Sequence, residues 1–356
     1  CTVLVDDIEV GHGSGDSKKE AEQQAAREAL RRATAGTGSG GVSDGGYAVI
    51  FITEAYAAEL ADAFGARAEF LLAQDVIAQD ASPERIVRGG EGSSMALALR
   101  ALLQREDAIG LLSAGNTGAL LTGATLITKR IHGIRRAAMA PVIPTTTGSA
   151  VLIDCGANAE CTPEYLVQFA YLGNFYAQRV LGVAKPRVAL LNIGAEEEKG
   201  DTLRHETYAL LKEAGEAGRI HFIGNVEAND AMMGAADVIV TDGFTGNVVL
   251  KSMEGLGKFI LKELKAVFLS SAKTKLAAGL VKGDLGQMKK LLDPSEVGGT
   301  PFLGIQKPVI KAHGGSNARA IENAVLRAKE YAESGFIADI QANIEHMRVE
   351  PGMEKN

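Results

Sequence analysis

The chain has 356 residues, of which 46% are hydrophobic and 23% charged, and its formal net charge is -7. This length and apolar content suffice for one large or two ordinary globular domains, and the acidic balance argues against a general nucleic-acid-binding protein. No apolar run reaches the roughly 18 residues of a membrane-spanning helix, so a membrane-embedded protein is not expected.

The first 46 residues read as a separate opening segment. TVLVD (2–6) has a strand pattern, GHGSGD (11–16) is a Gly-rich turn, and Asp16 to Ala33 is predicted to be a helix that Ser17 caps. Residues 34–46, TAGTGSGGVSDGG, have the composition of a flexible linker. We therefore expect a strand-turn-helix segment at residues 1–33 and a main domain at residues 47–356. The start at Cys1 rather than Met suggests a fragment or a processed product.

Beyond the linker, short apolar runs alternate with helical patterns. The predicted strands are YAVIFI (47–52), AEFLL (68–72), DAIGLLS (107–113), AVLID (150–154), RVALLN (187–192), RIHFIG (219–224), ADVIVTD (236–242) and PVIKA (308–312). Helical patterns occupy Ala55 to Phe64, Met95 to Gln104 and Thr202 to Ala214. This alternation is typical of an α/β fold in which helices cover both faces of a mostly parallel sheet.

Five of these strands are followed by loops that combine Gly with Asn, Asp, Lys or His. The loops are AGNTGA (114–119), CGANAE (155–160), IGAEEEKGD (193–201), GFTGN (243–247) and HGGSN (313–317). Ligands of open parallel sheets bind outside the carboxyl ends of the strands, and Gly lets backbone N–H groups approach an anion closely. The loops Ser113–Gly118 and Thr245–Asn247 have this character, so we predict an anion-binding site at the strand ends.

Three polar residues of these loops also have an ordinary structural interpretation. Lys199, a single cation among acids, is either a solvated surface charge or a phosphate-binding, oxyanion-stabilising lysine. His313 on sequence grounds is favoured as a buried structural histidine. Asp242, at a strand end, can simply cap the turn that follows.

Motifs of several common enzyme classes are missing from the sequence. It contains no GxGxxG or Walker A loop, no HExxH and no Ser-His-Asp order. The cysteines, Cys1, Cys155 and Cys161, lack a zinc spacing and are odd in number, which favours a reducing cytoplasm over a disulfide framework. Cys155 is expected to be a small buried thiol. The chemistry indicated is anion handling without metal, cofactor or covalent intermediate.

A lysine-rich stretch covers residues 251–290. It holds nine lysines against Glu254, Glu263 and Asp284, and nine minus three leaves a local charge of +6. The apolar residues assigned to this stretch are Phe259, Ile260, Leu264, Phe268, Leu276 and Leu280. We predict an amphipathic helical hairpin at about residues 253–292 whose apolar side meets an anionic membrane surface, with dimer packing as the alternative.

Four long blocks carry a family resemblance that extends from about Gly46 to about Met347. They are SAGNTGALLTGA (113–124), PRVALLNIGAEEEKG (186–200), FIGNVEANDAMMGAADVIVTDGFTGNVVLKSMEG (222–255) and PVIKAHGGSNARAI (308–321). These blocks resemble phosphate acyltransferase, the PlsX family. The resemblance implies that acyl-acyl-carrier-protein and inorganic phosphate give acyl phosphate for bacterial phospholipid synthesis.

The resemblance also implies a fold, a location and site residues. The fold would be a three-layer α/β/α sandwich like isocitrate and isopropylmalate dehydrogenases, in a cytoplasmic homodimer attached peripherally to the inner face of the cell membrane. Lys199 matches a lysine described as essential in the family, and His313 and Asn247 complete the predicted catalytic set, with His313 as candidate proton donor to the leaving thiol. The predicted phosphate or substrate contacts are Ser113, Gly115, Asn116, Thr117, Gly118, Asn158, Asp242, Gly243, Thr245 and Gly246.

The opening segment departs from that family. Members of the family begin with a strand and an Asp-Ala-Met-Gly-Gly-Asp loop that borders the active site. This loop sequence is absent from the present chain. Residues 1–33 instead resemble the second half of a double-stranded-RNA-binding domain of ribonuclease III type, and Lys18 and Lys19 match phosphate-contacting lysines. The segment is a loose appendage, a replacement for the missing strand and helix, or an RNA-binding module. Half a domain argues against RNA as a partner, and an impaired chimera with residual RNA or membrane binding stays the alternative function.

Overall fold

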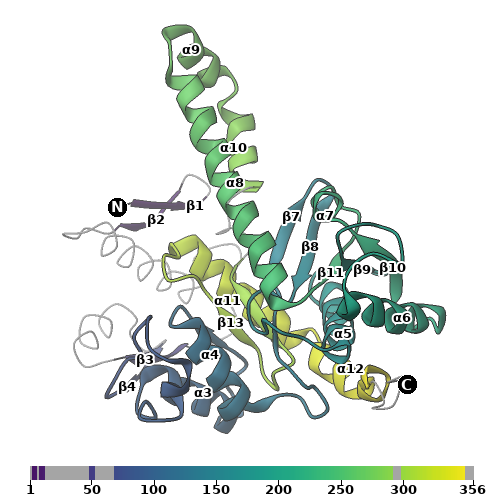
Figure 1. Cartoon of the computed structure of the whole chain (residues 1–356). Helices are drawn as coiled ribbons and strands as arrows, with labels where there is room; N and C mark the ends of the chain where they lie inside the picture. The colour runs from purple at the N-terminus through teal and green to yellow at the C-terminus, as the bar shows by residue number, and fades with distance from the viewer. Residues whose placement is uncertain (1, 6–7, 13–47, 53–67, 292–297, 349–356) are drawn as a thin grey trace.

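The computed structural model describes residues 2–5, 8–12, 48–52, 68–291 and 298–348. A body of sheets and helices carries a long helical arm that projects away from it (Figure 1). The predicted helices at residues 16–33 and 55–64 and the linker at 34–46 lie outside the described residues.

A five-stranded sheet forms one half of the body, in the order β10-β9-β11-β8-β7. Its strands are β7 (Val142–Thr145), β8 (Gly148–Ile153), β9 (Arg187–Leu191), β10 (His221–Val226) and β11 (Val238–Val240). Neighbouring strands are parallel except β7 and β8, which are antiparallel. Because side chains alternate along a strand, Val151 and Ile153 enter one core and Leu152 enters another. Both faces are buried, which explains the near-continuous apolar runs.

Helices cover both faces of this sheet. The helices on one face are α5 (Pro163–Arg179) and α6 (Thr202–Glu216), with α12 (Phe336–Ala342) packed against α5. The other face carries α7 (Ala228–Met232) and the start of α8 (Gly243–Leu269), whose Val249, Leu250 and Met253 pack on the second core. The carboxyl end of β11 therefore leads almost directly into α8, while the loops 154–162 and 192–201 connect β8 to α5 and β9 to α6.

A four-stranded sheet, in the order β5-β13-β12-β6, forms the other half of the body. Its strands are β5 (Leu111–Ser113), β6 (Ala138–Met139), β12 (Thr300–Leu303) and β13 (Val309–Lys311). Their core includes side chains of α3 (Ser94–Gln104) and α4 (Thr117–Gly123), and α11 (Ala318–Glu333) contacts β5 and β13. Only β5 and β13 are parallel to each other.

The expected α/β class is confirmed, but the expectation of one mostly parallel sheet needs correction. The described strands fall into four sheets, and two of the three pairings in the four-stranded sheet are antiparallel. The reason is the short connection between β12 and β13, residues 304–308, since a parallel crossover needs a dozen or more residues. The predicted strands are confirmed in position, although β5 and β11 contain fewer residues than their apolar runs.

Two small sheets involve the start of the chain. β3 (Ala48–Ile52) pairs in parallel with β4 (Ala68–Leu72), as their apolar runs predict. β1 (Thr2–Val5) and β2 (Ile8–His12) form an antiparallel pair, and among the described strands they pair only with each other. The described part of the opening segment therefore adds no strand to the two large sheets.

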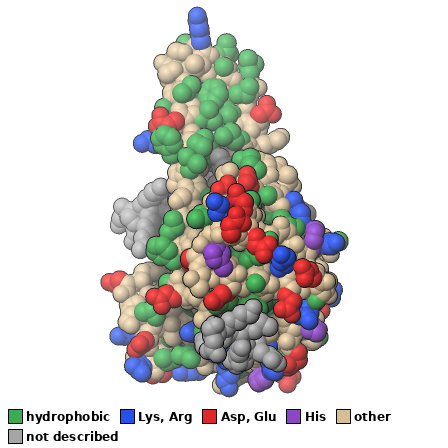
Figure 2. All heavy atoms as spheres, turned by 45° about the vertical axis from the view of Figure 1, so that its right-hand side comes forward, with side chains coloured by type: hydrophobic (Ala, Val, Ile, Leu, Met, Phe, Trp, Pro, Cys, Tyr) green, Lys and Arg blue, Asp and Glu red, His purple; other side chains and the backbone are tan. Residues whose placement is uncertain are grey.

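The projecting arm consists of α8, α9 (Ala272–Leu280) and α10 (Lys282–Leu291) (Figure 1). Asp242 caps α8, so this helix begins ten residues before the predicted hairpin start at 253. Hydrophobic side chains gather on the visible face of the arm (Figure 2). Within the described residues, no helix combines the length and apolar character needed to cross a membrane.

Candidate active site

Asp242 joins β11 to α8 by capping the helix. Its Oδ1 accepts the backbone N–H of Thr245 at 2.8 Å, and its Oδ2 accepts the Thr245 hydroxyl at 2.8 Å. Burial alone would raise the pKa of the Asp242 carboxyl, but the Thr245 bonds and the neighbouring Arg204 charge bring the pKa below its ordinary value. The capping interpretation of Asp242 is thus confirmed, and Asp242 and Thr245 satisfy each other's polar groups.

Arg204 ties this cap to the neighbouring strand end. Its Nη1 bonds Oδ2 of Asp201, the N-cap residue of α6, at 2.9 Å, while its Nη2 pairs with Asp242 and donates to the Thr245 hydroxyl at 3.2 Å. Its side chain is only 13% exposed. Because β9 and β11 are adjacent and parallel, one guanidinium holds the first turns of α6 and α8 together.

The loop after β8 packs against the start of α8. Asp154 is fully buried, and its carboxylate accepts backbone N–H groups of Met139 at 2.8 Å and of Asn158 at 2.7 Å. Burial raises the pKa of Asp154 to about 6, while these bonds act in the opposite direction. An added Cβ on Gly246 would lie 1.9 Å from the carbonyl oxygen of Asp154, so only Gly allows this approach.

The amide of Asn158 forms hydrogen bonds within the protein, whereas the side chain of Asn247 is exposed. Asn158 donates to the carbonyl of Ala137 at 2.8 Å and to Asp154 at 3.0 Å, so its amide fixes the loop. Asn247 is exposed on the first turns of α8, and Gly156 of the β8–α5 loop approaches it, with an added Cβ lying 3.6 Å from its Oδ1. The side chain of Asn247 therefore lies on the surface beside this loop.

The loop that carries Lys199 connects β9 to α6, and hydrogen bonds from side chains to its backbone carbonyls hold it in place. Asn192 donates to the carbonyl of Lys199 at 2.9 Å, Asn225 donates to that of Glu196 at 2.8 Å, and His205 bonds that of Glu198 at 2.8 Å. Lys199 itself is exposed, and its side chain lies over Gly194. The loop is thus fixed while the ammonium group faces solvent.

A second group of predicted residues lies at the carboxyl ends of β5 and β13. Ser113 is in register with Lys311, and the carbonyl of Ser113 accepts the N–H of Ala312 at 2.9 Å. Asn116 is buried: its Oδ1 caps α4 through Ala119 N–H at 2.9 Å, and its amide donates to three carbonyls of the preceding loop, those of Ala78, Gln79 and Ala81. Asn116 therefore shapes the Ser113–Gly118 loop.

His313 is exposed, so its interpretation as a buried structural histidine is wrong. Its Nδ1 accepts the N–H of Gly315 at 3.0 Å, which in the neutral ring leaves the proton on Nε2. The loop 313–317 lies beside Ala114, whose carbonyl oxygen is 3.9 Å from an added Cβ on Gly314.

The predicted residues therefore fall into two groups. The first holds Lys199, Asn158 and the start of α8, and the second holds Ser113–Gly118 and His313. Among the described residues, no hydrogen bond or ion pair joins one group to the other. Cys155 is a buried thiol as expected, with a pKa raised by burial, and the described residues contain no cluster of three metal-binding side chains.

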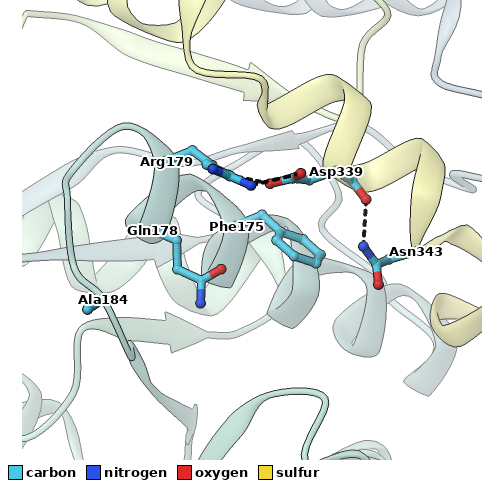
Figure 3. A pocket seen from close by; sticks show the side chains of 6 residues that line it. All are labelled: Phe175, Gln178, Arg179, Ala184, Asp339 and Asn343. Atoms are coloured by element: carbon cyan, nitrogen blue, oxygen red, sulfur yellow. Dashed lines mark hydrogen bonds and ion pairs between the residues drawn. The ribbon is translucent and has the colours of Figure 1, made fainter.

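A cavity of about 440 Å³ lies away from both groups, between α5 and α12 (Figure 3). The residues that line it are Phe175, Gln178, Arg179, Ala184, Asp339 and Asn343. Arg179 pairs with Asp339 across it, and Asn343 donates to the Asp339 carbonyl at 2.9 Å. None of the predicted site residues lines this cavity, so we do not assign the site to it.

Comparison with known proteins decides the family. A family model described as "Fatty acid synthesis protein" matches residues 52–339. A phosphate acyltransferase of Thermoanaerobacter pseudethanolicus is 46% identical over 281 residues, 79% of this chain and 83% of the relative, and one of Lysinibacillus sphaericus is 47% identical over 279 residues, 78% and 83% of the two chains. The chain belongs to the phosphate acyltransferase family.

Two further matches concern the fold and the opening segment. The EutD phosphotransacetylase of Staphylococcus aureus aligns with a TM-score of 0.54 at 15% identity over 86% of this chain and 91% of that chain, which is a likeness of fold alone. Residues 1–32 match a model described as "Double-stranded RNA binding motif", in agreement with the resemblance of the opening segment. The match to the "Fatty acid synthesis protein" model begins at residue 52, beyond that segment.

Two residues that hold the strand-end loops of this phosphate acyltransferase family member, Asp154 and Arg204, were not predicted from the sequence. Asp154 ends the run AVLID and was visible as a polar residue at a strand end. Arg204 had no such signal, because an arginine in the first turn of a helix is common and its partner Asp242 lies 38 positions away.

Proposed function

We propose that the chain transfers the acyl group of an acyl-acyl-carrier-protein to inorganic phosphate, producing acyl phosphate for bacterial phospholipid synthesis. The observation that carries this proposal is the set of Gly-rich loops at the carboxyl ends of β5, β8, β9, β11 and β13. The 46% identity to a phosphate acyltransferase supports it. We also propose a relation to the isocitrate and isopropylmalate dehydrogenase fold, based on the helices that cover both faces of the five-stranded sheet.

The proposed reaction needs positioning more than a strong base. A phosphate oxygen attacks the thioester carbonyl carbon, the carbonyl oxygen becomes an oxyanion, and collapse of the tetrahedral intermediate breaks the carbon–sulfur bond. Phosphate already carries negative charge near neutral pH, so the protein has to bind it against the carbonyl and stabilise the developing charge. Backbone N–H groups at helix N-termini and a cation are suited to both tasks.

Three exposed side chains take the catalytic roles in this proposal. Lys199 binds phosphate and stabilises the oxyanion, because its ammonium is exposed on a loop whose backbone is fixed. His313 donates the Nε2 proton to the leaving thiolate, since its Nδ1 already accepts the N–H of Gly315. Asn247 orients the substrate from the first turns of α8.

The remaining predicted residues supply backbone groups and loop shape. In this proposal the N–H groups of Thr117 and Gly118 at the start of α4 bind the anion. The N–H groups of Gly115, Gly243 and Gly246 donate to Oγ of Ser113 and to the carbonyls of Asn158 and Asp242, so these glycines shape the turns. The side chains of Asn116, Asn158 and Asp242 act indirectly by holding these turns.

The decisive experiment measures acyl phosphate directly. Purified protein is incubated with palmitoyl-acyl-carrier-protein and inorganic phosphate, and the product is trapped with hydroxylamine. We expect acyl phosphate from the wild type and none above background from Lys199→Ala. Lys212→Ala is the matched control, because Lys212 is an exposed lysine of α6 that pairs with Glu197 of the same loop. Full activity of Lys199→Ala would refute the role of Lys199, and an inactive wild type would favour the impaired chimera.

We further propose that the arm contacts an anionic membrane surface, so that the protein is peripherally attached to the inner face of the cell membrane. Leu276 is 71% exposed, Leu280 82% and Phe259 58%, in a stretch with a net charge of +6. Apolar side chains flanked by lysines suit insertion at an anionic interface. Leu264 and Phe268 are half-buried within the arm, whereas Ile260 is exposed at 39%.

Vesicle flotation tests the membrane contact. The wild type is expected to float with vesicles of anionic phospholipid at low salt, and Leu276→Ser/Leu280→Ser is expected to remain at the bottom of the gradient. We also propose that the protein is a homodimer, in which the same apolar side chains would instead pack between two copies of the chain. Sedimentation velocity of the wild type and of the double variant tests this proposal. A double variant that floats normally but becomes monomeric would assign these two leucines to the dimer.

A further inference from the structure

Lys311 is a buried lysine for which the proposed mechanism has no use. It ends β13, it is 9% exposed, and its ammonium donates to the carbonyl of Ala312, the next residue. Burial lowers the pKa of Lys311 to about 8. Among the residues that the structure describes, no carboxylate contributes to this pKa, which burial alone lowers.

A lysine at this position is costly for the fold. Removing an ammonium group from water without a counter-ion is unfavourable by several kcal/mol in general. The other residues of β13, Val309 and Ile310, are fully buried aliphatic side chains. An apolar residue of similar length would fill the same place without this penalty, so packing alone does not account for a lysine here.

The position of the ammonium group indicates where that anion lies. Because Lys311 bonds the Ala312 carbonyl, its Nζ lies against the peptide that leads into His313. The neighbouring strand places Ser113 in register with Lys311, and the N–H of Ala312 bonds the Ser113 carbonyl at 2.9 Å. The charge is therefore at the shared carboxyl ends of β5 and β13, where the Ser113–Gly118 and His313–Asn317 loops begin.

We propose that Lys311 binds the inorganic phosphate substrate from the base of the Ser113 and His313 loops. This inference rests on the proposed acyl transfer to phosphate. The ammonium supplies the charge, and its two N–H groups that do not bond the Ala312 carbonyl donate to the anion. Lys199, on the other group of loops, then serves mainly the thioester oxyanion.

Lys311→Met tests the proposal, with Lys307→Met as its matched control. Lys307 precedes the same strand at its amino end, and its ammonium donates to the carbonyls of Arg105 at 3.0 Å and Ala108 at 2.9 Å. For Lys311→Met we expect the KM for phosphate to rise at least about tenfold, with an unchanged KM for the acyl-carrier-protein substrate and an unchanged or higher Tm. For Lys307→Met we expect the reverse, a lower Tm and an unchanged phosphate KM.

A conservative variant and a binding measurement separate the outcomes. Lys311→Arg keeps the charge and is expected to recover part of the phosphate affinity, which a merely structural role would not predict for a larger side chain. A phosphate KM of Lys311→Met within twofold of the wild type would overturn the inference. If the wild type makes no acyl phosphate, the proposed function fails, and calorimetric titration with inorganic phosphate still decides the role of Lys311: heat lost in Lys311→Met supports it, and equal heat refutes it.

Discussion

Arg204 and Asp242 form a buried ion pair that connects the first turn of α6 to the residue that caps α8. Their side chains are 13% and 8% exposed. Asp242 also accepts two hydrogen bonds from Thr245, and Arg204 also bonds Asp201. The pair therefore sets the relative position of the loop that carries Lys199 and the turn that carries Asn247.

Arg204→Leu is expected to destabilise the protein by about 3 kcal/mol, because Asp242 is left buried without its cation. Urea unfolding followed by circular dichroism measures the change. Arg348→Leu is the control, since Arg348 and Glu345 pair at the surface with 48% and 69% exposure and such pairs contribute under about 1 kcal/mol. Equal losses in the two variants would contradict the role of the buried pair.

Gly246 and Gly255 lie on the same helix and are expected to respond to alanine with opposite sign. At Gly246 the new Cβ would meet the Asp154 carbonyl oxygen at 1.9 Å, so backbone must move and we expect a loss of about 3 kcal/mol. At Gly255 nothing lies within 4 Å, so alanine is expected to stabilise by about 0.5–1 kcal/mol through helix propensity. Thermal unfolding of both variants checks this, and a stable Gly246→Ala protein would disprove the close contact.

Asn116→Asp tests whether the amide of Asn116 does more than cap a helix. Aspartate preserves the acceptor for Ala119 N–H but removes the donor to three loop carbonyls, so we expect a loss of about 2 kcal/mol or more. Asn317→Asp is the control, because Asn317 caps α11 through Ala320 N–H at 2.9 Å in the same way, and it is expected to change stability by less than about 0.5 kcal/mol. Similar urea midpoints for the two variants would show that the carbonyl bonds contribute little.

The stability of the wild type is expected to depend on pH through Lys311. The pKa of Lys311 is lowered to about 8 in the folded protein from 10.5, so the unfolded chain binds more protons between these values and the free energy of unfolding rises with pH in this window. Relative to Lys311→Met, the wild type should gain up to about 3 kcal/mol from pH 8 to 10.5. Urea unfolding of both proteins across this range measures it, and parallel curves would mean that the pKa is not lowered.

The sequence predicted the fold class and most strands, because buried parallel strands require continuous apolar runs whatever their neighbours are. RVALLN became β9, and PVIKA became β13. The helix α5 was not predicted as an element, although PEYLVQFAYLGNFYAQR is mostly buried, since a helix that is apolar on most sides lacks a clear period. The division into two large sheets was not predicted either, because strand pairing depends on contacts between segments that are distant in the chain.

For the site, the sequence by itself determined which residue types stand at the strand ends, since Gly, Asn and Lys follow the apolar runs directly in the chain. Only the tertiary structure decided what those side chains are free to do. The polar groups of Asn116, Asn158 and Asp242 bond neighbouring backbone and side chains, whereas Lys199 and His313 are exposed. Bonds such as Arg204 to Asp242 join residues far apart in the chain, and no local pattern records which distant partner neutralises a buried charge.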